Sequence, residues 1–172
     1  MINLPIFYFG YLTILFSIIG FGYLSSKILS IRLSLGELGL SGILFMTILS
    51  YITNLAFPHN FIHNSIFLVL GLFACLSLLR KSLFRKRIKL ILIISSILFV
   101  GILMFKTHDD FLYYHFPYTV SLIEFKKIFG LGNLEHGFRT PSSIFYFNSL
   151  FYLPIIEKSL INSGAIFFLI FT

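Results

Sequence analysis

Residues 61–105 read FIHNSIFLVLGLFACLSLLRKSLFRKRIKLILIISSILFVGILMF, two long apolar runs separated by a short basic segment. Six of the 13 lysines and arginines of the chain lie in residues 80–89 of that stretch. A helix needs about 20 apolar residues to cross the hydrocarbon core of a bilayer. Because positive charge accumulates in cytoplasmic loops, the pattern predicts two spanning helices joined on the cytoplasmic side. Phosphate binding by the basic segment is the alternative, and contact with anionic lipid is compatible with either interpretation.

The composition of the whole chain indicates the same environment. Of its 172 residues, 58% are hydrophobic and 11% are charged, whereas soluble domains average about 45–50% and about 25%. These values exclude a soluble globular domain, a disordered tail and a nucleic-acid-binding module. Cys75 is the only cysteine, so the chain holds no internal disulfide and no zinc site built on cysteines.

Four segments have the length and hydropathy of membrane spans. They lie near Leu4–Leu24, Leu38–Phe57, Phe61–Leu79 and Ile88–Phe105. A helix buried in a soluble core is excluded, since too few polar residues remain to cover such a core. The sequence therefore predicts an all-α fold, a polytopic transmembrane helix bundle, in which residues 1–105 form four transmembrane helices.

The cations predict the orientation of this bundle. The N-terminal stretch and Pro58–Asn64 carry no lysine or arginine, whereas Lys27, Arg32 and residues 80–89 fall on the opposite side of alternating spans. We therefore expect an integral protein of the bacterial inner (plasma) membrane with its N-terminus outside, residues 80–89 cytoplasmic, and residues 106–141 in the periplasm.

Residues 106–141 form the longest polar stretch, and an acidic pair opens it. Asp109 and Asp110 follow the fourth predicted span closely, where carboxylates are costly unless they are solvated, paired or metal-bound. One interpretation is a general base or cation site at the mouth of a membrane cavity. The other is a helix N-terminus, where acids complement the helix dipole. In a helix that begins at the pair, Asp110 and Tyr114 share a face.

Two kinds of metal site are considered for this region. His108, Asp109–Asp110 and His115 match no dedicated zinc spacing. A divalent cation, Mg²⁺ or Mn²⁺, shared between a carboxylate and a substrate phosphate is the form that fits better. His59 and His63 lie in the preceding short outer loop and are predicted to be interfacial polar residues.

An amphipathic helix is predicted next. Pro117 would kink or restart a helix, because proline lacks an amide donor and clashes with the preceding turn. From residue 116 to 129 the apolar side chains form a broad stripe, while Glu124, Lys126 and Lys127 face elsewhere. Such a helix lies at the membrane interface or packs on the neighbouring spans.

A glycine-containing segment, Gly130–Arg139, precedes the last apolar part of the chain. Arg139 stands before Thr140–Pro141, which resembles an N-cap followed by proline at the first helical position. Arg139 either contacts a phosphate at that helix start or anchors the helix at the interface. The helix is expected to continue to Pro154, as a short re-entrant or interfacial helix or the outer half of a fifth span. Residues 142–172 are expected to hold further membrane helices, cut off at the C-terminus.

Three motifs in a fixed order resemble a known superfamily. The order is DDxxxYH at Asp109–His115, GLGNLxHG at Gly130–Gly137, and an aromatic helix that contains Asn148 and Ser149. It resembles the GT-C superfamily of polytopic membrane glycosyltransferases, and in particular an uncharacterised group of bacterial GT-C-like multi-pass membrane proteins. The match covers about residues 100–153.

The resemblance implies a function and roles for individual residues. It implies the N-terminal portion of an integral membrane glycosyltransferase that uses a polyprenyl-phosphate-linked sugar donor on the outer face. An acidic motif early in the first large outer loop of GT-C enzymes supplies the catalytic base or helps hold a metal, and here that role falls on Asp109–Asp110. Arg139 would contact the phosphate, and Tyr114, His115 and His136 would shape the substrate site.

The chain departs from the GT-C pattern in two respects. Its acidic loop follows the fourth predicted span rather than the first, and GT-C enzymes have many more spans, which would lie beyond Thr172. The alternatives are a non-catalytic multi-pass membrane protein, such as a transport or polymer-assembly subunit, and an inactive gene fragment. The first, second and fourth predicted spans lack ionisable residues once their ends are trimmed, which counts against ion-coupled transport.

Overall fold

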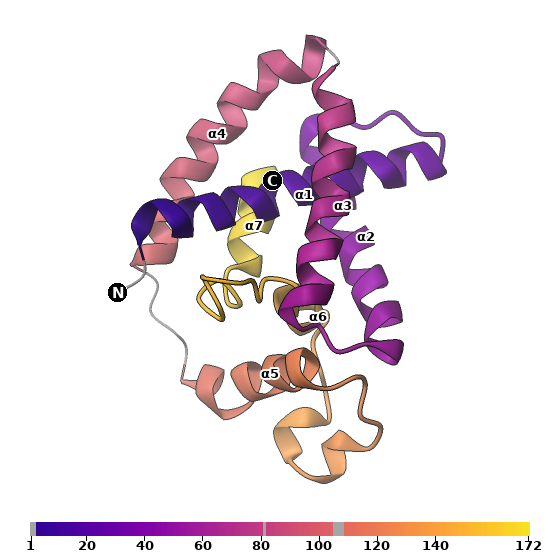
Figure 1. Ribbon diagram of the computed structural model, residues 1–172, viewed down its shortest axis with the longest axis vertical. Coiled ribbons are helices and arrows are strands. Elements are labelled where there is room, and N and C mark those ends of the chain that lie inside the picture. Colours follow the sequence, from indigo (N-terminus) through magenta and orange to yellow (C-terminus); the bar gives the residue numbers. More distant parts are fainter. Residues whose placement is uncertain (1–2, 81, 105–108) are drawn as a thin grey trace.

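The computed structural model describes residues 3–80, 82–104 and 109–172, and within these ranges the chain is helical without a strand. One isolated bridge joins Leu153 to Glu157. The predicted all-α class is therefore confirmed. Ten helical elements follow one another along these ranges (Figure 1). They are α1 (Leu4–Ile28), α2 (Leu35–Ala56), α3 (Phe61–Leu79), α4 (Ser82–Leu103), η1 (Phe111–His115), α5 (Phe116–Glu124), η2 (Leu131–Asn133), η3 (His136–Phe138), α6 (Ser143–Ser149) and α7 (Gly164–Phe171).

Three of these helices, α1, α2 and α3, are long and apolar enough to cross a membrane, which indicates an integral membrane protein. The fourth predicted span is also a helix, α4, but it begins at Ser82 rather than Ile88. Its first turns therefore include three of the basic residues of the 80–89 segment and Lys89 follows in the next turn, so its apolar part is shorter than that of the other three helices. The last residue of the predicted span, Phe105, lies outside the described residues.

Local caps set where the long helices begin. Ser34 starts α2 in a capping box: its amide donates to Glu37 Oε2 at 2.6 Å, and the Glu37 amide donates to Ser34 Oγ at 3.4 Å. The α2 helix thus begins three residues before the predicted Leu38. Asn60 starts α3 by accepting from the His63 amide at 3.0 Å, and proline in the first turn starts α1.

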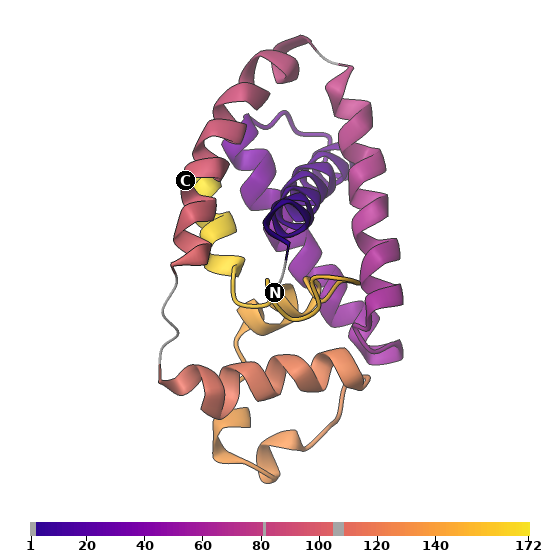
Figure 2. The ribbon, with the colours of Figure 1, turned by 60° about the vertical axis from the view of Figure 1, so that its left-hand side comes forward.

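The first helix runs across α2 and α3 instead of alongside them, and the view in Figure 2 looks almost along its axis. Close backbone approach makes this crossing possible. A Cβ on Gly20 would collide with the carbonyl of Gly71 in α3, and one on Gly42 would collide with the carbonyl of Ile18 in α1. Small residues at helix crossings are typical of membrane proteins.

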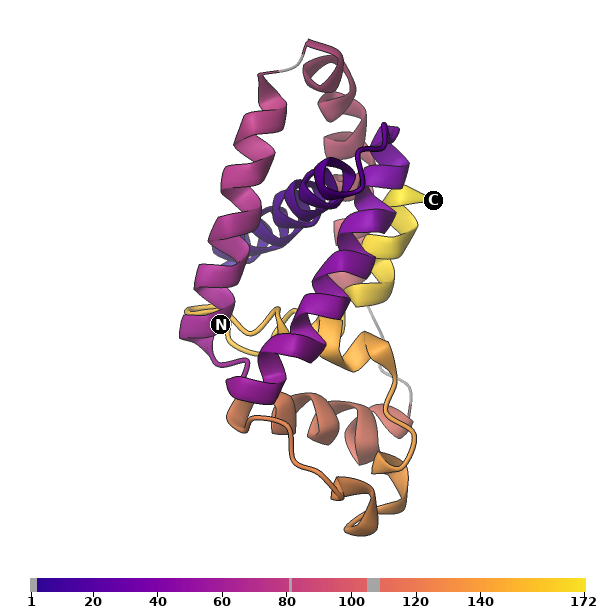
Figure 3. The same ribbon diagram turned by 90° about the vertical axis from the view of Figure 1, so that its right-hand side faces the viewer.

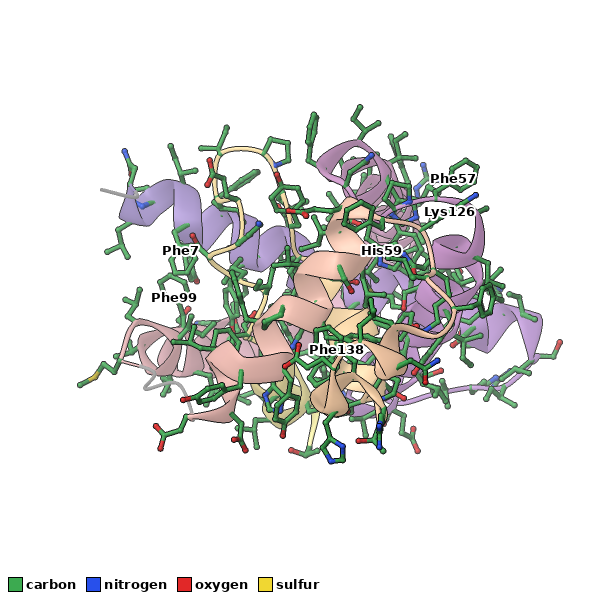
Figure 4. The ribbon with its side chains drawn as sticks, turned by 90° about the horizontal axis from the view of Figure 1, so that it is seen from below. Phe7, Phe57, His59, Phe99, Lys126 and Phe138 are labelled. Atoms are coloured by element: carbon green, nitrogen blue, oxygen red, sulfur yellow. The ribbon has the colours of Figure 1, made fainter. Side chains whose placement is uncertain are left out.

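Hydrogen bonds and aromatic rings also hold α1 in place. Ser17 Oγ donates to the Leu68 carbonyl of α3 at 3.0 Å, and the buried Tyr11 hydroxyl donates to the Ser95 carbonyl of α4 at 3.0 Å. The Phe7 ring lies 5.5 Å from that of Phe99 (Figure 4). These contacts make α1 the centre of the core.

The outward faces of the other long helices remain apolar. Leu44 of α2, Phe73 of α3 and Ile97 of α4 are 62%, 64% and 66% exposed. An exposed apolar surface of this extent marks a face that contacts a membrane or a protein partner. It suits direct contact with a lipid bilayer.

Residues 109–149 form a second layer, the cap layer, in which α5 and the loop after it lie below the long helices in Figure 1, while α6 lies beside the lower ends of α2 and α3. It packs on the end where α2 finishes and α3 begins. The His59 amide donates to the Leu122 carbonyl, and the Lys127 amide donates to the Asn54 carbonyl, both at 2.8 Å. The α5 helix stops at Glu124, so the predicted amphipathic helix is shorter than the expected 116–129 stretch.

The helix predicted from Thr140–Pro141 to Pro154 is wrong at both ends. Ser142 is the N-cap, and its Oγ accepts from the Ile144 amide at 3.4 Å. The resulting α6 has seven residues, far fewer than a membrane span needs. Turns follow it up to Ser163, and α7 occupies the C-terminal end.

Candidate functional site

The acidic pair lies at the start of the cap layer. Asp109 is exposed, and Asp110 is half-exposed at the N-cap position of η1. The turn that follows is a π-turn, in which the Phe116 amide donates to the Phe111 carbonyl. Pro117 in the first turn of α5 explains this geometry, because proline cannot donate to the residue four positions before it. Such π-turns are frequent at functional sites.

Tyr114 and His115 connect η1 to two other parts of the cap layer. Their rings meet edge to face at 4.4 Å. A Cβ on Gly137 would lie 2.7 Å from the Tyr114 Cβ, so the η3 turn packs directly on Tyr114. The His115 ring lies 5.0 Å from that of Phe145 in α6. The DDxxxYH and GLGNLxHG motifs therefore touch.

The two remaining predicted site residues lie on the outside of the glycine-rich loop. His136 is exposed. Arg139 is exposed as well, and its Nε donates to the Gly132 carbonyl at 3.3 Å. Gly132 packs on the Arg139 backbone, where a Cβ would lie 3.0 Å from the Arg139 Cα. Because α6 begins at Ser143, Arg139 precedes the helix start by more than the sequence predicted.

A small pocket of about 230 Å³ lies beside the acidic pair in the chain, where the end of α4 meets η1, α5 and residues 158–166. Five of its nine lining residues are apolar, three are neutral polar residues and one is a lysine. They are Ile102, Phe111, Phe116, Lys158, Ser159, Ile161, Asn162, Ser163 and Ile166. Lys158 Nζ lies 6.0 Å from the centre of the Phe116 ring and 3.7 Å from Glu124 Oε1. Phe111, which follows Asp110 in the sequence, forms part of the pocket wall.

Lys127 forms a second polar cluster that the sequence did not reveal. Its Nζ donates to the hydroxyl of Tyr118 at 3.0 Å and to that of Tyr146 at 2.6 Å. Tyr51 of α2 stacks on Tyr146 with ring centres 3.7 Å apart. Burial alone would lower the pKa of Lys127, but the two hydrogen bonds raise it above the ordinary value. Burial raises the pKa of Tyr146 to about 12, so the Lys127 ammonium contacts a neutral phenol at Tyr146.

The predicted interfacial role of His59 is wrong, because its side chain is fully buried. Figure 4, which looks onto the cap layer, shows His59 near one end of α5. Its Nε2 lies 3.1 Å from the Ser50 carbonyl and its Nδ1 lies 2.6 Å from Ser149 Oγ. A carbonyl only accepts, so Nε2 carries the hydrogen. In the neutral ring Nδ1 then accepts the single hydroxyl hydrogen of Ser149, in place of the Tyr146 carbonyl that lies 2.7 Å from the same oxygen. Burial, with the stacked His63 ring as a second cause, lowers the pKa of His59 to about 3.

Buried amides complete the contact between the cap layer and the long helices. Asn64 Nδ2 lies 2.8 Å from the carbonyls of His59 and Ser149 and 3.0 Å from that of Tyr152. Asn54 Nδ2 lies 3.2 Å from the Leu122 carbonyl at the end of α5. The only sequence signal for this network was the presence of asparagines within two otherwise apolar helices.

Metal ligation was considered for His108, the acidic pair and His115. His108 lies outside the described residues, and among those that the structure describes no three His, Cys, Asp or Glu side chains gather as a metal site would require. Asp109 and Asp110 offer two carboxylates. A Mg²⁺ ion is usually bound by one or two protein carboxylates, together with substrate phosphates.

Comparison with known proteins gives one match. No curated protein and no solved structure matches the chain. A family model described as Domain of unknown function (DUF8201) matches residues 5–172, which is nearly the whole sequence. The chain therefore belongs to the DUF8201 family.

Proposed function

We propose that this protein is a GT-C-like integral membrane glycosyltransferase that uses a polyprenyl-phosphate-linked sugar donor on the outer face of the bacterial inner membrane. The observation that carries the proposal is the position of Asp109–Asp110. The pair opens a π-turn whose first residue, Phe111, lines a pocket at the junction of a long apolar helix and the cap layer. A lipid-linked donor needs a site of this kind, where a polar head and an apolar chain enter together.

The chemistry assigned to the pair is general base catalysis. One carboxylate removes the proton from an acceptor hydroxyl, and a lone pair of that hydroxyl oxygen attacks the anomeric carbon of the donor sugar. The bond from that carbon to the phosphate oxygen breaks, and its electrons leave with the polyprenyl phosphate. Asp109 is exposed and Asp110 is half-exposed, so both residues reach the aqueous side of the cap layer.

The leaving phosphate needs positive charge nearby. Lys158 lies in the pocket wall and can supply it. A Mg²⁺ or Mn²⁺ ion held by the acidic pair would supply more. Arg139 stays an expected phosphate contact, reached by exchanging its hydrogen bond to the Gly132 carbonyl, and Tyr114, His115 and His136 would shape the sugar site.

The orientation that places this site outside the cell follows from the cations. Arg80 and residues 82–89 lie at one end of α3 and α4, and the cap layer lies at the other end (Figure 3). A cytoplasmic basic end then puts the cap layer in the periplasm. Polyprenyl-linked sugars that have been flipped across the membrane would meet the site there.

The test uses the full-length protein in the cell that encodes it. Asp109→Asn and Asp110→Asn, singly and together, remove the base with little change in volume. Glu135→Gln is the matched control, because Glu135 is an exposed carboxylate of the same layer. We expect at least a 100-fold fall in surface-glycan assembly for one of the aspartate variants, from the loss of base catalysis, and no change for the control. Wild-type glycan levels in both single variants and the double variant, at equal amounts of membrane protein, would refute the proposal.

A further inference from the structure

A large cleft lies at the end of the molecule opposite the cap layer. Its volume is about 960 Å³, at the upper end of the range of about 300–1,000 Å³ that is usual for ligand sites. It lies where the end of α1, the start of α2, the end of α3 and the start of α4 come together (Figure 3). All three candidate membrane helices therefore have an end in this cleft.

The polar part of the cleft is positively charged. Lys27, Arg32 and Arg87 line it, and the described lining residues include no aspartate or glutamate. Within the part of the chain that the structure describes, none of these three cations is in an ion pair. The nearest acid along the chain, Glu37, is not among the lining residues and accepts from the Ser34 amide at 2.6 Å. The three lining cations therefore have no ion-pair partner among the described residues.

The remaining walls are apolar. Leu33, Leu35 and Leu38 belong to the connector and the first turns of α2, and Leu78 and Phe84 belong to the ends of α3 and α4 that face them. Phe84 is 6% exposed and Leu38 is 7% exposed, so both are fixed parts of the wall. An acyl chain gains free energy by burying its apolar surface against such a wall, whereas a free inorganic anion has no apolar surface to bury.

We propose that this cleft binds an anionic phospholipid of the adjacent leaflet, with its phosphate on the three cations and the upper part of an acyl chain on the leucine and phenylalanine wall. Basic pockets between membrane helices on the cytoplasmic side are suited to anionic head groups. The cleft is separate from the cap layer, so the proposal does not depend on glycosyl transfer.

The ligand test uses the purified protein in mild detergent and three probes. Dihexanoyl phosphatidylglycerol carries the negative head group and a chain, dihexanoyl phosphatidylcholine carries the chain without net charge, and glycerol phosphate carries the charge without a chain. Calorimetric titration should give at least tenfold tighter binding for the first probe than for either of the others. Equal binding of the two lipids, or of glycerol phosphate and phosphatidylglycerol, would overturn the assignment.

Variants then locate the binding. Arg32→Gln and Arg87→Gln should each weaken phosphatidylglycerol binding about fivefold, and together about 25-fold, since each basic residue near an anionic surface contributes about that factor. Both arginines are exposed, and their circular dichroism spectra should match that of the wild type. Lys126→Gln, an exposed cation of the cap layer, should leave binding unchanged. Equal weakening by Lys126→Gln would mean diffuse surface attraction, and unchanged binding in the double arginine variant would equally refute the site.

Discussion

His59 should make the stability of the fold depend on pH. Its imidazole is fully buried, and burial holds its pKa near 3, compared with about 6.5 in an unfolded chain. Between pH 6.5 and 3 the imidazole of His59 is protonated in the unfolded chain and neutral in the folded protein. The contribution of His59 to the free energy of unfolding is therefore fully present above pH 6.5 and is lost as the pH falls towards 3.

The size of the effect follows from the two pKa values. Each pH unit between them costs about 1.4 kcal/mol, so the fall from pH 7.5 to 4.5 costs about 2.7 kcal/mol, nearly all of it below pH 6.5. For a chain of 172 residues, about 1 kcal/mol corresponds to about 2–4 °C in melting temperature. The expected decrease that His59 alone causes is then about 5–10 °C.

The measurement compares the wild type with His59→Gln in mild detergent, with melting followed by circular dichroism from pH 7.5 to 4.5. His59→Gln should be less stable at pH 7.5, because the Ser50 carbonyl and the Ser149 hydroxyl lose well-placed partners, but its melting temperature should change much less with pH. The two curves should therefore converge towards acid. His136→Gln, at an exposed site, should keep the wild-type slope. Parallel curves for the wild type and His59→Gln would refute the assignment of a neutral buried imidazole.

Three further changes test the packing. Gly42→Ala should lower the free energy of unfolding by about 1–3 kcal/mol, because its Cβ would overlap the backbone of α1, while Gly101→Ala, whose Cβ meets nothing within 4 Å, should raise it by up to about 1 kcal/mol. Lys127→Met should cost about 1–3 kcal/mol through its two phenol partners, and the exposed Lys126→Met less than about 0.5 kcal/mol. Asn64→Leu, which removes the buried amide that faces the carbonyls of His59, Ser149 and Tyr152, should cost about 3 kcal/mol or more. Chemical unfolding in detergent measures the two pairs of variants and Asn64→Leu. Equal effects within either pair, or an Asn64→Leu protein as stable as the wild type, would contradict the contacts.

The long helices were predictable because their signals are local. An apolar run of about 20 residues specifies a helix in lipid or in a buried core, whatever surrounds it. The predicted bounds of α1, α2 and α3 therefore lie within a few residues of the observed bounds. The errors at helix ends come from caps that compete with each other. Ser142 has a hydroxyl in the right place to cap α6, so Thr140–Pro141 is left outside the helix.

The crossing of α1 over α2 and α3 was not predictable from one sequence. Gly20 meets Gly71, and Gly42 meets Ile18, only because the helices cross at those points. A glycine in an apolar run is common and carries no partner with it. The expected set of four spans side by side needed information on which glycines face each other, and periodicity does not contain it.

The candidate site was predictable only in part, for the same reason. The acidic pair and the Tyr114–His115 step were singled out from adjacent residues, and the structure brings Tyr114 against the Gly137 turn. The Lys127 cluster joins residues from α5, α6 and the connector after α5, which no spacing rule connects. Pairings between residues that are far apart in the sequence form only when the cap layer folds.

The buried polar network explains how the cap layer is held against the long helices. The end of α5 leaves carbonyls without helical partners, as every helix end does. Asn54 of α2 donates to the Leu122 carbonyl, and Asn64 of α3 donates to the Ser149 carbonyl at the end of α6. These groups are buried, so breaking one bond removes a donor from a desolvated carbonyl, which is costly. The Leu122 carbonyl still keeps the His59 amide, and the Ser149 carbonyl keeps the more distant Tyr152 amide. The network therefore restricts sliding of α5 and α6 on the long helices. Since η1 continues into α5 without a break, the position of Asp110 depends on asparagines that contact neither the pair nor its pocket, and Asn64→Leu should reduce glycan assembly even where the protein remains folded.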